Sequence, residues 1–249
     1  MSPPRFSDEF RRQFRRLLVC RRDVRRFLAK PVDLHLISDI LGLACLAPSV
    51  GNSQPWRFVM VNDPGRRAQV LETFRRSNHD ALAAYSEAQA TLYSKLKLSG
   101  LAEAPCHVAV FIDEATSAGD GLGRRTMPET LQYSAVAAIQ VFWLAARTHG
   151  LGVGWVSILD PAEVVRALEV PPSWLLVAYL CVGYPVRDEG PRGTADARDR
   201  VHRHARVGRT CRGPDGRGVA PVPRENREGL RRARSRPSTR RGQRPRGIA

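Results

Sequence analysis

The chain has 249 residues, with 40 lysines and arginines against 24 aspartates and glutamates, and a formal net charge of +16. Its five cysteines are widely spaced, without a C-x-x-C pair or a histidine at ligand spacing, which argues against a disulfide scaffold and a metal site. The N-terminus lacks a signal sequence and no apolar stretch reaches the roughly 18 residues of a membrane span, so we expect a cytoplasmic protein that does not enter the membrane.

Helix and strand patterns alternate along the chain, which predicts a layered α/β or α+β fold. Ser7 is expected to cap the first helix. Cys45 and Cys181 lie in apolar runs and are expected to pack as small hydrophobic residues. The expected helices are 7–20, 33–47, 64–76, 79–97, 127–149 and 162–168, and the expected strands are 56–62, 106–113, 153–158 and 174–183.

Four arginines fall within six residues, at Arg21, Arg22, Arg25 and Arg26. Guanidinium groups match the geometry of phosphate oxygens, so the cluster is a candidate phosphate site. The alternative is a solvated basic helix face, which is the common meaning of a charge run. Asp23, inside the cluster, would act as a general base if it points at a substrate, or would form an internal ion pair with Arg22 or Arg26.

Short polar side chains gather in residues 48–54, directly before an apolar run. Such side chains can hydrogen-bond the edge of a planar heterocycle. The alternative is an ordinary turn, in which Asn and Ser bond their own backbone and Pro55 fixes φ. Further along, Gly152 and Gly154 precede Trp155, and these small residues would allow the backbone to approach a ring closely.

Several motifs resemble one known family in their order and spacing. The string S-x-x-N-x-Q-P-W at residues 49–56 resembles the FMN-contacting loop of the nitroreductase superfamily, and R-R-x-x-R-x-F from Arg21 resembles its ribityl-phosphate site. The segments GLGRRTMPET, QYSAVAAIQVFWLAARTHG and GVGWVSILDP, which begin at Gly121, Gln132 and Gly152, resemble the 5,6-dimethylbenzimidazole synthase branch of that superfamily.

Two positions distinguish the branches. Ordinary nitroreductases usually carry serine where this chain has Asp23, which favours the synthase branch. Asn52 stands where the synthases tend to have an apolar residue, and in this it resembles the nitroreductases. Two activities therefore stay open, the synthase and an NAD(P)H-dependent nitro- or flavin reductase in which FMN only relays hydride.

The resemblance implies a nitroreductase-like α+β fold, with a mixed central sheet flanked by helices, in a homodimer whose FMN sites lie at the subunit interface. It implies an enzyme that fragments reduced FMN with O2 and receives that FMN from a flavin reductase. The apolar helix 133–146 is a candidate for the dimer interface, or else an ordinary core helix. The loop 121–127 lacks the context of a dinucleotide loop and is expected on the substrate side.

The resemblance also assigns residues. Catalytic roles would fall on Asp23 and on Ser157, the latter beside flavin N5, and Arg22 and Arg25 are the expected phosphate ligands. The expected FMN-binding residues are Arg21, Arg22, Asp23, Val24, Arg25, Pro48, Ser49, Asn52, Ser53, Gln54, Trp155, Val156 and Ser157.

We expect residues 1–190 to form a nitroreductase-like FMN domain and residues 191–249 a disordered tail. The tail holds 18 arginines, no lysine and 5 acidic residues, and contains no Phe, Tyr or Trp. It is either a polyanion-binding arm, a solvated tail, or an out-of-frame translation from near residue 190. We favour the frameshift, because a GC-rich strand read in the wrong frame gives such a composition.

Two observations would contradict these interpretations of the tail. Resequencing that finds no nearby single-base change restoring a family-like ending would remove the frameshift. Salt-dependent nucleic-acid binding that persists after deletion of residues 191–249 would remove a function as a polyanion-binding protein through the tail. Apart from non-specific binding by the tail, no nucleic-acid partner is expected.

Overall fold

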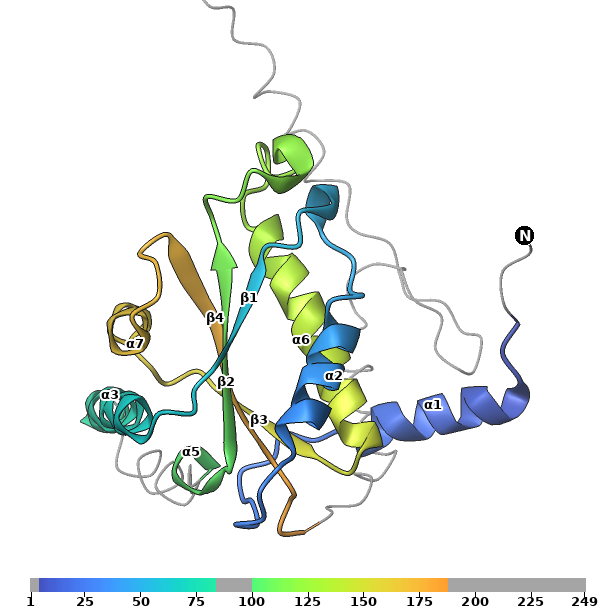
Figure 1. Ribbon diagram of the computed structural model, residues 1–249, viewed down its shortest axis with the longest axis horizontal. Coiled ribbons are helices and arrows are strands. Elements are labelled where there is room, and N and C mark those ends of the chain that lie inside the picture. The colour runs from blue at the N-terminus through green and yellow to red at the C-terminus, as the bar shows by residue number, and fades with distance from the viewer. Residues whose placement is uncertain (1–4, 84–99, 188–249) are drawn as a thin grey trace, which may run out of the picture. The chain divides into compact units, whose positions relative to one another are not determined.

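A four-stranded sheet forms the centre of the computed structural model, which describes residues 5–83 and 100–187 (Figure 1). Its order is β1-β2-β4-β3, and all neighbouring strands are antiparallel. In place of the expected mixed sheet, the described residues contain a parallel pairing only at the isolated bridge between Asp23 and Val153. The strands are β1 (Trp56–Met60), β2 (Cys106–Asp113), β3 (Gly152–Val156) and β4 (Trp174–Gly183).

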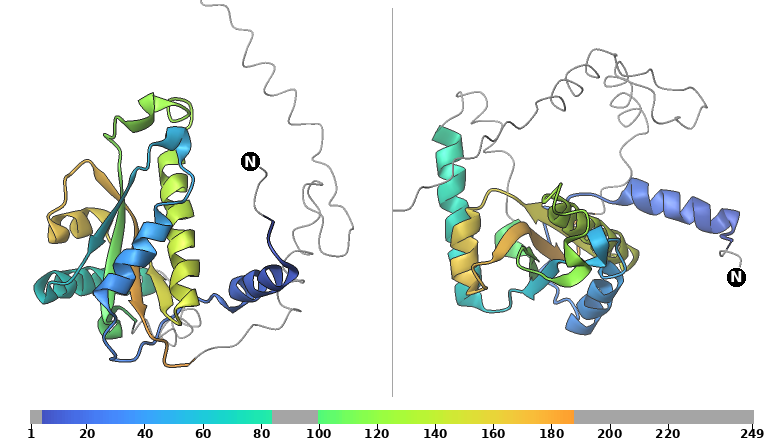
Figure 2. Two further views of the ribbon diagram at one scale, coloured as in Figure 1. Left: turned by 45° about the vertical axis from the view of Figure 1, so that its right-hand side comes forward. Right: turned by 90° about the horizontal axis from the view of Figure 1, so that it is seen from above.

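Helices cover both faces of this sheet (Figures 1 and 2). α2 and α6 pack on one face, where Ile40 and Phe142 are buried, and α3 and α7 pack on the other with Val70 and Val164. Because β2 is covered on both faces, it is apolar apart from His107 and its last residue, Asp113. The helices are α1 (Asp8–Cys20), α2 (Leu34–Ala44), α3 (Pro64–Ala83), α5 (Gly100–Glu103), α6 (Thr130–Thr148) and α7 (Pro161–Leu168), with short 3₁₀ helices η1 (Val50–Asn52) and η2 (Ala118–Gly121).

Side-chain caps fix where helices begin. The predicted cap Ser7 is confirmed, because its hydroxyl accepts a hydrogen bond from the Phe10 backbone N–H at 3.1 Å. At α7, the Asp160 carboxylate accepts from the Glu163 N–H at 3.0 Å, and Pro161 occupies the first turn. The chain therefore turns sharply into α7 shortly after β3 ends.

One predicted break between helices is wrong. The sequence predicted separate helices at 64–76 and 79–97, but α3 runs unbroken through Ser77 and Asn78. Serine and asparagine cost a helix only up to about 0.7 kcal/mol each, which the burial of the apolar face of α3 outweighs. The rest of the second predicted helix lies outside the described residues, as does the predicted tail 191–249.

The two cysteines predicted to pack in the core differ. Cys181 is buried on β4, which confirms the prediction. Cys45 is exposed, so that prediction is wrong. Cys45 is the C-cap residue of α2, whose buried face is formed instead by Ile37, Ile40 and Ala44.

α6 presents two different faces. The buried face includes Ala135, Ala138 and Ile139, which pack in the monomer core. The other face exposes 58% of Tyr133 and 43% of Val136. The core interpretation of the apolar helix 133–146 therefore accounts for one face and leaves the Tyr133 face open to a partner.

A buried histidine joins β2 to β4. His107 is 2% exposed, with Nδ1 3.0 Å from the Tyr179 hydroxyl and Nε2 3.1 Å from the Ala104 carbonyl. The Nε2–H tautomer satisfies both contacts, because Nε2 then donates to the carbonyl and Nδ1 accepts from the hydroxyl. Burial disfavours the imidazolium and, with the nearby Arg67, lowers the pKa of His107 to about 4.

We expect His107 to make the fold sensitive to acid. Its pKa is lower in the folded than in the unfolded chain, so its contribution to stability is complete above the unfolded value of about 6.5 and is lost as the pH falls towards 4. The shift corresponds to about 3 kcal/mol. Urea unfolding at pH 7 and pH 4.5 measures it: His107→Gln should flatten the pH dependence, whereas the exposed-histidine variant His149→Gln should keep it.

Candidate active site

Residues 21–27, with the arginine cluster predicted to bind phosphate, form the phosphate segment. This segment lies along β3. The Val24 N–H donates to the Val153 carbonyl at 3.0 Å, and the Trp155 N–H donates to Asp23 Oδ1 at 2.9 Å. An ideal Cβ at Gly154 would lie 2.2 Å from the Val24 carbonyl oxygen. The sequence predicted that small residues here admit a ring, but in the structure the backbone of the phosphate segment itself occupies the space.

Asp23 has two donors within its own chain. Besides the Trp155 N–H at Oδ1, it pairs through Oδ2 with Arg25 Nε at 3.1 Å. The predicted internal partners, Arg22 and Arg26, are therefore corrected to Arg25. The Asp23 side chain is 36% exposed, and each carboxylate oxygen keeps a second lone pair, so the group remains accessible to a substrate.

The remaining arginines of the segment point in different directions. Arg22 Nη1 donates to the carbonyls of Val19 and Arg21 at 2.7 and 2.9 Å, while its buried Nε has no partner among the described residues. The Arg21 guanidinium lies over the Trp143 ring, 4.9 Å from its centroid. Arg26 is exposed. An unpartnered buried guanidinium nitrogen is costly, so Arg22 is open to an anionic acceptor.

The structure adds Trp143, which the sequence analysis did not assign to the site. Its indole N–H donates to the Arg22 carbonyl at 3.1 Å, and its ring lies 6.5 Å from that of Trp155. A buried tryptophan needs an acceptor for its N–H, but the sequence does not show that the acceptor lies 121 positions away. Trp143 thus ties α6 to the phosphate segment.

We expect Trp143→Phe to weaken FMN binding about three- to tenfold, because it leaves the part-buried Arg22 carbonyl without its donor. Fluorescence titration with FMN and with riboflavin, which lacks the phosphate, measures the effect. Phe142→Leu is the matched control, since Phe142 is fully buried on the same helix but its ring has no N–H to donate to the phosphate segment. Equal losses for both ligands, or for both variants, would contradict the role of Trp143.

The turn 48–54, the second segment predicted to bind FMN, lies near the start of α6. The Val50 N–H donates to Ser134 Oγ at 3.0 Å, and the Gln54 N–H donates to Ser49 Oγ at 3.0 Å. Asn52 and Gln54 adopt positive φ values of 53° and 41°, which non-glycine residues rarely do. Both are exposed, as is Pro48.

Ser53 stands apart from its neighbours in this turn. It is 4% exposed, and its Oγ has no hydrogen-bond partner in the described part of the chain. The turn therefore combines the internal hydrogen bonds of an ordinary turn with a buried hydroxyl that is left for a ligand or a second chain.

Arg57 holds the end of this turn, and sequence reasoning missed it. Its Nη1 donates to the carbonyls of Gln54 and Trp56 at 3.2 and 3.0 Å, and its Nη2 donates to Asp113 Oδ2 at 2.9 Å. Arg57 lies inside the apolar run 56–61, where the sequence gives a lone strand arginine no evident role. The contacts stabilise the positive-φ conformation of Gln54.

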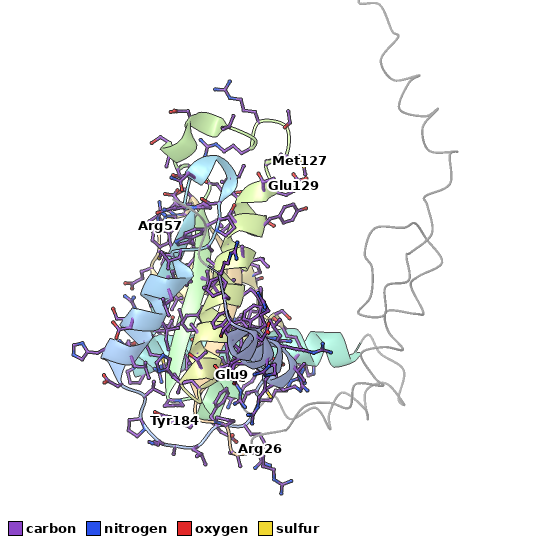
Figure 3. The ribbon with its side chains drawn as sticks, turned by 90° about the vertical axis from the view of Figure 1, so that its right-hand side faces the viewer. Glu9, Arg26, Arg57, Met127, Glu129 and Tyr184 are labelled. Carbon is purple, nitrogen blue, oxygen red and sulfur yellow. The ribbon has the colours of Figure 1, made fainter. Side chains whose placement is uncertain are left out.

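Within one chain, the two predicted segments do not meet. Trp143, which binds the first, and Ser134, which binds the second, are nine positions apart on α6, or about 13 Å along the helix. Figure 3 shows the same separation, with Arg57 near one end of the molecule and Arg26 near the other. Trp155 joins the first segment, Val156 ends β3, and Ser157 follows as an exposed residue.

The described residues contain neither a candidate metal site nor a candidate membrane span. Residues 5–83 and 100–187 hold no group of three or more His, Cys, Asp or Glu side chains that could bind a metal ion. In the same ranges, no helix is long and apolar enough to cross a membrane.

The sequence profile of the nitroreductase family matches residues 18–184, so the chain belongs to this family. It is 54% identical over 188 residues to a 5,6-dimethylbenzimidazole synthase of Rhodospirillum rubrum, a match that covers 76% of this chain and 89% of that protein. It is 46% identical over 180 residues to a 5,6-dimethylbenzimidazole synthase of Rhodobacter capsulatus, with 72% and 87% covered.

Solved structures share the fold. Iodotyrosine deiodinase, crystallised with FMN and 3-iodo-L-tyrosine, aligns with a TM-score of 0.59 at 27% identity and covers 71% of this chain and 90% of its own. A BluB-like flavoprotein from Clostridium difficile 630 aligns with a TM-score of 0.56 at 21% identity, with 74% and 96% covered. The expected nitroreductase-like α+β fold is confirmed.

The residues present fit a bound flavin phosphate. The structure leaves three buried side-chain polar atoms without a partner among its described residues, Arg22 Nε, Ser53 Oγ and Arg124 Nη1. Arg22 and Ser53 belong to the two segments that the sequence assigned to FMN. A donor in one segment and a hydroxyl in the other are therefore available to a ligand.

Proposed function

We propose that the chain is an oxygen-dependent enzyme that fragments reduced FMN to 5,6-dimethylbenzimidazole, the lower ligand of vitamin B12. The observation that carries the proposal is the Asp23 carboxylate, which the Trp155 N–H and Arg25 hold at the junction of the phosphate segment and the end of β3. The 54% identity to a synthase of this name supports it. Ordinary nitroreductases usually carry serine at the position of Asp23, so this carboxylate favours the synthase over a reductase.

Each segment has a separate task in this proposal. Reduced FMN supplies the carbons and nitrogens of the product and the electrons for O2; its carbohydrate remnant leaves as a small sugar phosphate, and the pyrimidine portion of the ring leaves as a separate product. Arg22 binds the phosphate, with Arg25 beside it, while the turn 48–54 holds the edge of the ring. Asp23 takes a proton from the ribityl side, and Ser157 hydrogen-bonds near flavin N5.

We propose further that the site forms between two copies of the chain. The phosphate segment and the turn 48–54 lie at opposite ends of α6, so one copy would supply each. α1 extends away from the sheet and the helices that cover it (Figure 2), has no buried residue and exposes Phe10 and Phe14. α6 exposes Tyr133. A homodimer would cover these apolar side chains.

Mixing two inactive variants tests the shared site. Arg22→Ala and Ser53→Trp affect different segments, so a mixed dimer has one site with both defects and one with neither. We expect each variant alone to be inactive and the co-expressed mixture to regain up to about half of the wild-type activity per mixed dimer. No recovery in mixed dimers isolated by two different tags would contradict a site built from two copies.

Product analysis tests the function itself. Purified protein is mixed with chemically reduced FMN, air is admitted, and 5,6-dimethylbenzimidazole is measured by mass spectrometry. Formation of the product is the expected result. Clean reoxidation to FMN without a fragment would contradict the proposal and favour an NAD(P)H-dependent reductase. In the cell, the proposal places the reaction in the cytoplasm, with a separate flavin reductase as the electron source.

A further inference from the structure

A glycine-rich loop, residues 118–125, packs directly on the turn 48–54. The loop begins with η2. An ideal Cβ at Gly119 would lie 2.4 Å from the Gly51 carbonyl oxygen, and one at Gly123 would lie 2.7 Å from Val50 Cγ2. Both glycines also have positive φ, at 77° and 78°. The loop therefore meets the backbone of the turn at Gly119 and the Val50 side chain at Gly123, and a substitution at Gly119 would push the two segments apart.

Arg124 in this loop carries the third buried polar atom without a partner in the described ranges, its Nη1. The other two such atoms, in Arg22 and Ser53, lie in the segments assigned to FMN. A buried guanidinium nitrogen that donates to nothing is costly, and this cost disappears when an acceptor reaches it. The neighbouring Arg125 is exposed, so the two adjacent arginines have different surroundings.

We propose that Arg124 is a further substrate-binding residue, which binds the acceptor atoms of the flavin ring and favours its reduced form. This inference rests on the proposed function. In the shared site proposed above, Arg22 of one copy binds the phosphate and the turn 48–54 of the other holds the ring edge, and the loop of Arg124 packs on that turn. The acceptors within its reach are therefore ring carbonyls and nitrogens. A fixed guanidinium stabilises the ring more when reduction has placed negative charge on it.

The matched pair Arg124→Met and Arg125→Met tests the proposal. Both variants lose one positive charge in the same loop, but only the first loses the buried donor. Dissociation constants are measured for riboflavin and FMN, each oxidised and, under anaerobic conditions, reduced. We expect Arg124→Met to weaken reduced riboflavin about tenfold or more and oxidised riboflavin at most about threefold, as for loss of a charge-assisted hydrogen bond. Arg125→Met should stay within about twofold of wild type, the range of an exposed charge.

Other outcomes would overturn the inference. If the two variants behave alike, the buried donor has no special role. If Arg124→Met weakens FMN but leaves riboflavin unchanged, the guanidinium binds phosphate and not the ring. If it weakens only the association of two copies, with the preference for reduced flavin intact, its acceptor lies in the second chain.

A second variant protects the test against misfolding. Arg124→Lys keeps the charge and loses the fork of donors, so it should retain the preference for the reduced ligand at a lower affinity. Loss of that preference in Arg124→Lys would also overturn the proposal. Failure of the proposed function is distinguishable, because then wild-type protein would give no product whatever the two arginine variants do to flavin binding.

Discussion

Replacing Asp23 by asparagine should abolish product formation while leaving the affinity for reduced FMN within about threefold of wild type. Asparagine has the same shape, so its amide oxygen can still accept from the Trp155 N–H, and only the pair with Arg25 is lost. That pair is about 40% exposed in both partners, and such pairs contribute roughly 0–1 kcal/mol. A lost general base, in contrast, lowers a rate by about 10²–10⁴.

The measurement separates chemistry from binding. Product is quantified by mass spectrometry after a single turnover with reduced FMN and air, and affinity is measured anaerobically on the same preparation. Asp23→Ser, which installs the residue usual in ordinary nitroreductases, should likewise bind reduced FMN and return it only as oxidised FMN. An Asp23→Asn enzyme that forms product within tenfold of the wild-type rate would remove Asp23 from the chemistry.

The two central strands, β2 and β4, were predicted with the bounds that the structure shows, Cys106–Asp113 and Trp174–Gly183. Both are mostly apolar because helices cover both faces of the sheet. The break predicted inside α3 failed because Ser77 and Asn78 only weakly disfavour a helix, and packing decided. Local pattern is thus reliable for strands that helices cover on both faces.

The site was predictable in its parts and not in its assembly. The motifs located the phosphate segment and the turn, but no local pattern reveals that the Trp155 N–H meets Asp23 from 132 positions away. Nor does a motif show that the two segments occupy opposite ends of α6, or that Arg57 fixes the turn. These facts depend on strand order and on helix packing, which couple residues that are distant along the chain.

The close approach of the phosphate segment to β3 gives the second large effect. Gly154→Ala should destabilise the fold by about 2–4 kcal/mol, from overpacking together with weakening of the Val24–Val153 and Trp155–Asp23 hydrogen bonds. The added methyl would lie 2.2 Å from a backbone oxygen, which cannot rotate away as a side chain can. FMN affinity should fall as well, because the segment that carries Asp23 must move.

Two comparisons make this prediction specific. Gly42→Ala, in an exposed turn of α2 with no atom within 4 Å of the new methyl, should stabilise the protein by up to about 1 kcal/mol. At Gly152 the obstacle is the Val24 side chain, 2.6 Å from an ideal Cβ, so Val24→Ala should recover part of the stability lost in Gly152→Ala. It should recover none in Gly154→Ala, where the obstacle is the Val24 carbonyl. Urea unfolding of the single and double variants measures both couplings, and equal recovery at the two glycines would contradict a backbone contact at Gly154.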